Sequence, residues 1–262
     1  MKHPIYKARC AFVFAHPGHE LKIHAWLETL KPTVFLLTDG SGSGGEGRVA
    51  LSQQTIAASG AVLDPISAPW RDRQAYELIL KGYGDQVITF VQQLAAKLQR
   101  SKVDYVICDS IEGFNPVHDL CGVIAFNACR LVEKQSGKRI ACFDFPLDGR
   151  PNERVALGST ETIVLSLSNE QWQHKLAAAN SNVALQKEVV DDFARYGESA
   201  FKEEVLAPVV LEYSLNALAQ EKPFYETYGE DRVQAGVYDY VLRYREHFMP
   251  LVDQINDWVQ SQ

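Results

Sequence analysis

The sequence lacks the features that identify several large classes of protein. No apolar run reaches the roughly 20 residues needed to span a bilayer. The first residues, MKHPIYKARC, lead directly into a strand-like run instead of the apolar stretch and small-residue cleavage site of a signal peptide. The five cysteines form no C-x-x-C pair, which favours buried thiols in a reducing compartment. We therefore expect a cytoplasmic protein without a transmembrane segment.

Signatures of phosphate binding are also missing. No Lys/Arg cluster interrupts a chain whose formal net charge is −7, which argues against a nucleic-acid partner. No G-x-x-x-x-G-K-[ST] loop is present, so a P-loop nucleotidase is unsupported. The expected partner is a small-molecule or glycoconjugate substrate, and the sequence leaves open whether the chain forms a homo-oligomer.

Apolar, strand-like runs alternate with helical stretches through residues 1–168. Such alternation predicts βαβ units and an α/β fold, a Rossmann-like, mostly parallel sheet with helices on both faces. The expected strands are 10–15, 33–37, 61–63, 103–108 and 139–145, and the expected helices are 17–30, 49–59, 85–100 and 117–133.

Residues 169–262 differ from the preceding part of the chain in composition and pattern. Helix-forming residues dominate 171–219 and 233–259, which predicts a helical C-terminal cap packed on the sheet domain as one structural unit. The aromatic, acidic stretch KPFYETYGEDRV between them is interpreted as a loop. Packing of the cap is the favoured explanation for the aromatic side chains of this part, with a sugar site or a subunit contact as alternatives. They are Phe224, Tyr225, Tyr228, Tyr238, Tyr240 and Tyr244.

Three histidines are placed where a site is expected. The segment Ala15-His16-Pro17-Gly18-His19-Glu20 carries two of them three residues apart, where a strand ends and a helix is expected to begin. His118 lies at a second strand-to-helix junction. Ligands of parallel α/β sheets bind outside the carboxyl ends of the strands, and three protein ligands with an open fourth position are typical of catalytic zinc. The pattern indicates a site for Zn²⁺ or another divalent transition metal.

The segment from Ala15 to Glu20 resembles the A-H-P-D-D-E signature of the PIG-L/LmbE-like N-acetylglucosaminyl deacetylases. Further features follow in the family's order over roughly the first 180 residues. They are Thr38-Asp39-Gly40, Arg48 ahead of Gly60, an H-P-D-H-like segment at Asn115 to His118, and a weaker match reaching Lys175. The resemblance implies a divergent member with a Rossmann-like fold, a zinc ion and hydrolysis of an acylated amino sugar.

The resemblance assigns roles to individual positions. The family's zinc ligands correspond to His16, His19 and His118, with histidine at 19 in place of the family's aspartate, so that a donor is kept and a His₃ site results. Arg48 would contact the substrate, although a surface helix residue is the alternative. Asp39 would orient a ligand histidine, or else cap its loop.

The chain also departs from the family at three helper positions. Gly18 stands where the family has its general base, Asn115 where it has a histidine that acts on the tetrahedral intermediate, and Val117 where an aspartate supports the last ligand. Another carboxylate would then have to act as base. Glu20 and Asp119 are the first candidates, followed by Asp39 and Glu112, while Asn115 could donate a hydrogen bond to an oxyanion.

These observations predict a zinc-dependent hydrolase that removes an acyl group, most simply acetyl, from an N-acylated amino sugar or glycoconjugate precursor. One alternative is a catalytically silent metal- or sugar-binding protein of the same fold. Another is a nucleotide-dependent enzyme that uses Gly40, Gly42 and Gly45, which match G-x-G-x-x-G. A zincin H-E-x-x-H site is excluded because His24 follows His19 by five positions, and His24 is expected to be an exposed helix residue.

Overall fold

A seven-stranded sheet forms the centre of the molecule. The computed structural model describes residues 3–42, 45–152 and 161–262. The strand order is β3-β2-β1-β4-β5-β7-β6, in which the first five strands are parallel, β7 is antiparallel to β5, and β6 is antiparallel to β7. The strands are β1 (Cys10–Phe14), β2 (Thr33–Leu36), β3 (Val62–Leu63), β4 (Tyr105–Asp109), β5 (Ala141–Phe145), β6 (Ile163–Ser166) and β7 (Glu203–Pro208).

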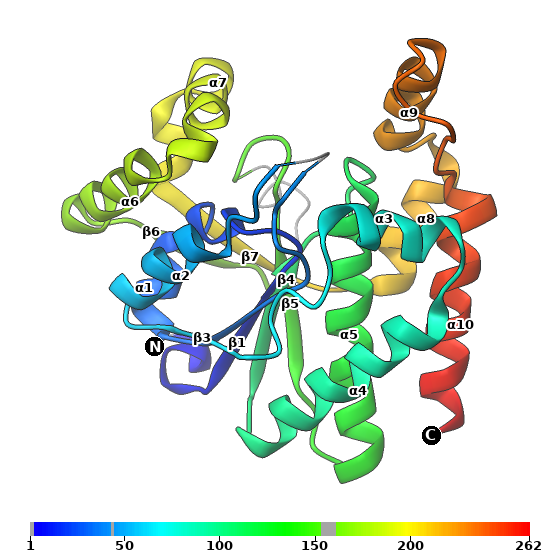
Figure 1. Cartoon of the computed structure of the whole chain (residues 1–262). Helices are drawn as coiled ribbons and strands as arrows, with labels where there is room; N and C mark the ends of the chain where they lie inside the picture. Colours follow the sequence, from blue (N-terminus) through cyan, green and yellow to red (C-terminus); the bar gives the residue numbers. More distant parts are fainter. Residues whose placement is uncertain (1–2, 43–44, 153–160) are drawn as a thin grey trace.

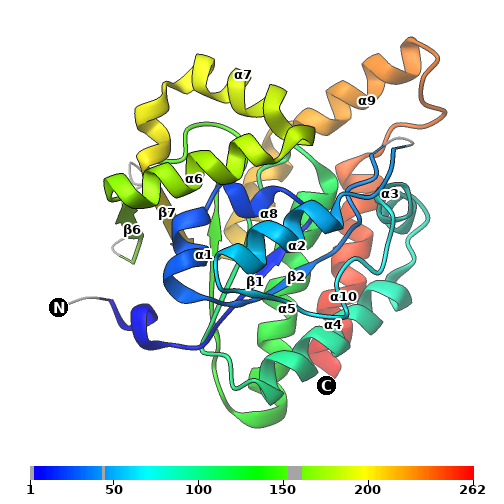
Figure 2. The same ribbon diagram turned by 60° about the vertical axis from the view of Figure 1, so that its left-hand side comes forward.

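Helices cover both faces of this sheet, as Figures 1 and 2 show. Because neighbouring side chains of a strand point to opposite faces, Ala11 and Val13 of β1 join one apolar cluster, and Phe12 and Phe14 join the other. The first cluster includes α4 (Gly84–Arg100), α5 (Pro116–Ser136) and α10 (Met249–Ser261), and the second includes α1 (His24–Leu30) and part of α2 (Val49–Ala58). All five residues of β1 are buried, which explains its uninterrupted apolar run. The predicted α/β fold is confirmed.

The remaining helices lie mainly toward the C-terminus. They are α3 (Asp72–Leu80), α6 (Asn169–Ser181), α7 (Gln186–Tyr196), α8 (Leu211–Gln220) and α9 (Phe224–Gln234). Figures 1 and 2 show α7 and α9 projecting from the layered body at the same end of the molecule. The buried Lys175 ammonium anchors α6 by donating to Glu204 Oε1 of β7 at 2.8 Å. None of the described helices has the length and apolarity that crossing a bilayer requires.

The chain after β1 differs from the helix expected over 17–30. A single turn of 3-10 helix, η2 (His19–Leu21), comes first, and α1 starts only at His24. Gly18 adopts φ +107°, a left-handed conformation that ends any regular helix at this point. Leu185 Cδ1 lies 2.2 Å from where a Cβ on Gly18 would stand, so a larger residue would also have to displace the Leu185 side chain.

Two other expectations were wrong, and one helix was not anticipated. Helix α3 occupies a stretch for which no element was predicted. The stretch 222–233, interpreted as a loop, forms α9, because the buried Glu226 carboxylate accepts a hydrogen bond from Tyr244 N at 2.7 Å and fixes this segment to the chain that follows. The stretch expected to be helical between 171 and 219 also contains β7, which joins the main sheet. The G-x-G-x-x-G match at Gly40, Gly42 and Gly45 spans residues 43–44, which lie outside the described residues.

Candidate metal site at the ends of strands β1 and β4

The three histidines singled out from the sequence meet beside the central strands. His16 and His19 follow β1, and His118 lies in the first turn of α5, just after the neighbouring strand β4. The chain winds from β1 toward β2 on one side and continues from β4 toward β5 on the other, which makes this the switch point of the sheet. The ring centroids are 5.3 Å apart for His16 and His19, 5.1 Å for His16 and His118, and 4.6 Å for His19 and His118.

These separations match those expected for imidazoles that share one cation. With a zinc–nitrogen distance of about 2.1 Å and a ring centre about 1.1 Å further out, tetrahedral ligands have centroids about 5 Å apart. Within the described residues, however, no group of three or more His, Cys, Asp or Glu side chains is already arranged to hold a metal ion. The three rings are therefore gathered at one place without their donor atoms being aligned on one point.

Thr38 and Asp72 both contact Nδ1 of the His16 ring. Its Nδ1 lies 2.7 Å from Thr38 Oγ1 and 3.0 Å from Asp72 Oδ1. The Thr38 hydroxyl donates its own hydrogen to Ala15 O at 3.0 Å, so its oxygen accepts from the ring. His16 Nδ1 therefore carries the proton, and Nε2 keeps the free lone pair that a metal ligand needs.

The His19 ring has an equivalent partner in Asp109, the last residue of β4. Nδ1 lies 2.8 Å from Asp109 Oδ2, and the same oxygen accepts from Ala15 N at 2.7 Å. Carboxylates that hold Nδ1–H in this way fix the tautomer and orientation of metal-binding histidines. The third ring differs, because His118 Nδ1 is buried without a hydrogen-bond partner among the described residues.

Burial controls the ionisation of this cluster. Desolvation, followed by the charge of the neighbouring imidazole, lowers the pKa of His19 and of His118 well below the ordinary value, so both rings are neutral. Burial also raises the pKa of Asp109 to about 8. For Asp72 burial acts in the same direction, but the hydrogen bond and charge of His16 outweigh it and hold the pKa of that carboxyl below its usual range.

Asp72 and Asp109 were not predicted from the sequence. Asp109 ends an apolar strand at the carboxyl edge of the sheet, which is a recognisable signal. Asp72 starts the unpredicted helix α3, and nothing local shows that its carboxylate reaches His16. Asp39, to which the orienting role was assigned, instead accepts from Ser41 N at 3.0 Å and caps its own loop, as the alternative interpretation had it.

The two carboxylates favoured as general base are directed at backbone amides. Glu20 is fully buried, and its Oε2 accepts from Gly18 N at 2.8 Å. Asp119 is also fully buried, and its Oδ1 accepts from Glu112 N at 2.8 Å and Gly113 N at 3.1 Å. Burial raises the pKa of Glu20, and it raises that of Asp119 to about 7. Both side chains thus hold the loops that carry the histidines.

Asn115, Arg48 and Glu112 also have local partners. Asn115 caps α5 by accepting from Val117 N at 2.8 Å, and its NH₂ group donates to the Tyr76 hydroxyl, which leaves one N–H for a substrate. The Arg48 Nε donates to Gly40 O at 2.8 Å and braces the loop after β2. Glu112 Oε2 accepts from Leu147 N at 3.1 Å.

Two backbone N–H groups of the loop considered for nucleotide binding already donate to other groups of the protein. Gly42 N donates to Asp72 Oδ2 at 2.6 Å, and Gly45 N donates to Ser41 O at 2.7 Å. A pyrophosphate cradle needs such N–H groups to be free. The arrangement therefore gives no support to the nucleotide alternative.

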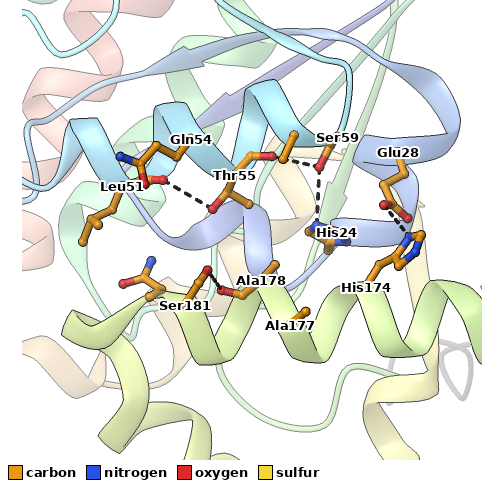
Figure 3. A pocket seen from close by; sticks show the side chains of 12 residues that line it. His24, Glu28, Leu51, Gln54, Thr55, Ser59, His174, Ala177, Ala178 and Ser181 are labelled. Carbon is orange, nitrogen blue, oxygen red and sulfur yellow. Dashed lines mark hydrogen bonds and ion pairs between the residues drawn. The ribbon is translucent and has the colours of Figure 1, made fainter.

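A cavity of about 460 Å³ lies elsewhere, between α1, α2 and α6. Figure 3 shows His24 facing Ser59 within it and Glu28 facing His174. His24 Nε2 lies 3.4 Å from Ser59 Oγ, and His174 Nδ1 lies 2.9 Å from Glu28 Oε1. His24 is 4% exposed, so its expected place on an exposed helix face was wrong: α2 and α6 cover it. None of the three clustered histidines lines this cavity.

Comparison with known proteins gives a similarity of fold. No protein-family model matches the chain, and no curated protein sequence matches it. Among solved structures, the conserved protein TT1542 from Thermus thermophilus is similar at TM-score 0.50 and 16% identity, over 78% of this chain and 95% of that one. The A40926 pseudoaglycone deacetylase Dbv21 has TM-score 0.48 and 16% identity, over 78% and 97% of the two chains. A triple mutant of a deacetylase from the teicoplanin biosynthetic pathway has TM-score 0.49 and 13% identity, over 77% and 99%. At such low identity the similarity to TT1542 concerns the fold alone, and it agrees with the α/β architecture described above.

Proposed function

We propose that the chain is a metal-dependent hydrolase that removes an acyl group from an N-acylated amino sugar or a glycoconjugate that contains one. The observation that carries the proposal is the convergence of His16, His19 and His118, with carboxylates behind two of the three rings. The motif resemblance to the PIG-L/LmbE-like deacetylases supplies the reaction class.

The residues present fit a zinc ion. Three imidazoles are a donor set typical of catalytic zinc and leave a coordination position for water or substrate. The buried, unpartnered His118 Nδ1 is a polar atom for which a ligand would account. Asp72 and Asp109 would hold Nδ1 of His16 and His19, and His118, whose Nδ1 has no such partner among the described residues, is the ring least restrained from turning toward the other two.

The metal and the residues of the chain would make separate contributions to the reaction. Bound zinc lowers the pKa of a water ligand and polarises an acyl carbonyl. The chain's own contribution is positional: Asp72 and Asp109 orient two rings, and Asp119 fixes the turn ahead of His118. The NH₂ group of Asn115, whose oxygen caps α5, is the part of that side chain able to donate to a developing oxyanion.

The position of the family's general base carries no side chain that could accept a proton. Gly18 replaces the family's base, and Glu20 and Asp119 each accept backbone hydrogen bonds. An uncompensated loss of a positioned base costs about 10²–10⁴ in rate. Slow turnover is therefore the expected behaviour.

Acetate release tests this function. The protein is stripped with a chelator, reloaded with zinc, and incubated with N-acetylated amino sugars and their oligomers. We expect release only in the zinc-loaded sample, and none from His118→Ala. His174→Ala is the matched control, because that histidine lies in the cavity between α1 and α6. Turnover that is equal with and without metal would refute the proposal.

A catalytically silent metal- and sugar-binding protein is the second candidate. The commitment of Glu20 and Asp119 to backbone amides favours it, because neither carboxylate is directed toward the rings by its described hydrogen bonds. One bound metal per chain without acetate release from any of these substrates would support this second candidate.

A further inference from the structure

The aromatic residues of the C-terminal part fall into two groups. Tyr225 and Tyr244 are 6% and 2% exposed, as packing of the cap predicts. Phe224, Tyr228 and Tyr238 are 52%, 44% and 42% exposed, and Tyr240, which belongs to none of the ring pairs described next, is 74% exposed. Packing therefore explains the first group and fails for the second, although burial of large apolar side chains is favourable.

The exposed rings form a continuous series that begins at the histidine cluster. Phe114, in the loop between β4 and α5, has its centroid 6.4 Å from that of His118. It stacks on Phe224 at 5.2 Å and an interplanar angle of 4°. Phe224 lies 6.1 Å from Tyr228, which lies 6.4 Å from Tyr238. We refer to Phe114, Phe224, Tyr228 and Tyr238 as the aromatic ladder.

The spacing along α9 explains why the ladder faces outward. Phe224, Tyr228 and Arg232 follow each other at intervals of four, so they share one side of the helix, while Tyr225 is buried on another side. The Arg232 guanidinium lies 5.8 Å from the ring centre of Tyr228 and 5.9 Å from that of Tyr238. In Figures 1 and 2 α9 stands clear of the layered body.

We propose that the aromatic ladder binds a carbohydrate chain whose N-acylated sugar lies at the histidine cluster. This inference rests on the proposed function and specifies its substrate class, an oligosaccharide or polysaccharide. A sugar ring has an apolar C–H face and a rim of hydroxyl groups, and it suits a flat aromatic face that has polar groups beside it. The hydroxyls of Tyr228 and Tyr238 and the Arg232 guanidinium provide these groups. A purely aliphatic chain would gain nothing from them.

Chain-length dependence tests the inference. Binding of N-acetylglucosamine and of its β-1,4- and β-1,6-linked oligomers of two to six units is measured by calorimetry on metal-free protein, and acetate release on zinc-loaded protein. We expect affinity to rise from one to four units. Phe224→Ala and Tyr228→Ala should each weaken hexamer binding about two- to tenfold. Tyr213→Ala is the matched control, because Tyr213 is 68% exposed on α8 and lies outside the ladder.

The two proposals can fail separately. Length-dependent binding that requires Phe224, without acetate release, supports the ladder and refutes the hydrolase. Equal affinity for monomer and hexamer, no binding of any oligomer, or hexamer binding unchanged by both substitutions overturns the ladder. Light scattering on the same variants gives a further outcome: a dimer that is lost with Phe224→Ala would assign these rings to a second copy of the chain and also overturn it.

Discussion

Two regions of the molecule contain paired histidines in different surroundings. At the ends of β1 and β4, Nδ1 of His16 and of His19 each bonds to a buried carboxylate. In the cavity between α1, α2 and α6, His24 bonds to a serine hydroxyl and His174 to the partly exposed Glu28. The carboxylates at the strand ends fix the His16 and His19 rings and leave Nε2 of each ring for a ligand.

The difference shows what distinguishes a candidate metal ligand from a packing histidine. Burial alone does not, because His24 is 4% exposed and His118 is 9% exposed. What differs is convergence: three rings from two strand-to-helix junctions meet within 5.3 Å at the strand ends. The predictions below test this contrast.

The largest effect is expected from His118→Ala. Removing one of three imidazoles leaves two donors, too few for a structured zinc site, so bound zinc should fall from one equivalent per chain to near zero. Elemental analysis after gel filtration measures it. His174→Ala should keep the full equivalent, and equal loss of zinc from both variants would contradict the distinction between the two regions.

Lowering the pH should destabilise the protein through His24, the buried histidine of the cavity. Burial lowers the pKa of His24 to about 4, below the value of about 6.5 in the unfolded chain. The unfolded state therefore binds the proton more readily, and this group's contribution to stability is lost as pH falls from about 6.5 toward 4. Relative to His24→Gln, the wild type should lose up to about 3 kcal/mol over that range, as measured by urea unfolding. A difference between the two proteins that does not vary with pH would count against this assignment.

Above pH 8, where the Asp109 carboxyl is ionised, Asp109→Asn should weaken zinc binding about 10- to 100-fold, because the charge that supports the His19 ring is lost. Competition with a chromophoric chelator measures the affinity. Asp39→Asn is the control, since that carboxylate accepts from Ser41 N in its own loop. The idea fails if the two variants bind zinc equally well.

The smallest expected effect is that of Asp119→Ala on stability. Its carboxylate accepts from Glu112 N and Gly113 N, and losing it leaves these amides without their partner, at a cost of about 2 kcal/mol. Glu133→Ala, at an exposed position on the same helix, should change stability little. Zinc affinity should survive in both variants. If Asp119→Ala instead abolished turnover at unchanged stability, Asp119 would regain its predicted role as base.

The sequence was informative where signals are local. Apolar runs such as Cys10–Phe14 predicted the buried strands, and Pro116 correctly opened α5. Two strand-end motifs located the histidines that the structure brings together. The position of Asp109 at the end of β4 is such a local signal, although its contact with His19 is not. The contact of Asp72 with His16 depends on how the segments after β1 and before α3 fold against each other, and no local pattern contains that information. Likewise α9 forms where turn-like residues predicted a loop, because tertiary contacts of Glu226 override local propensity.

The position of the metal in zinc-loaded crystals, located by anomalous diffraction above the zinc absorption edge, tests the central claim most directly. The account predicts one peak at the ends of β1 and β4, within about 2.1 Å of a nitrogen from each of His16, His19 and His118. A peak beside His24 and His174, or no peak between the three clustered rings, would contradict it.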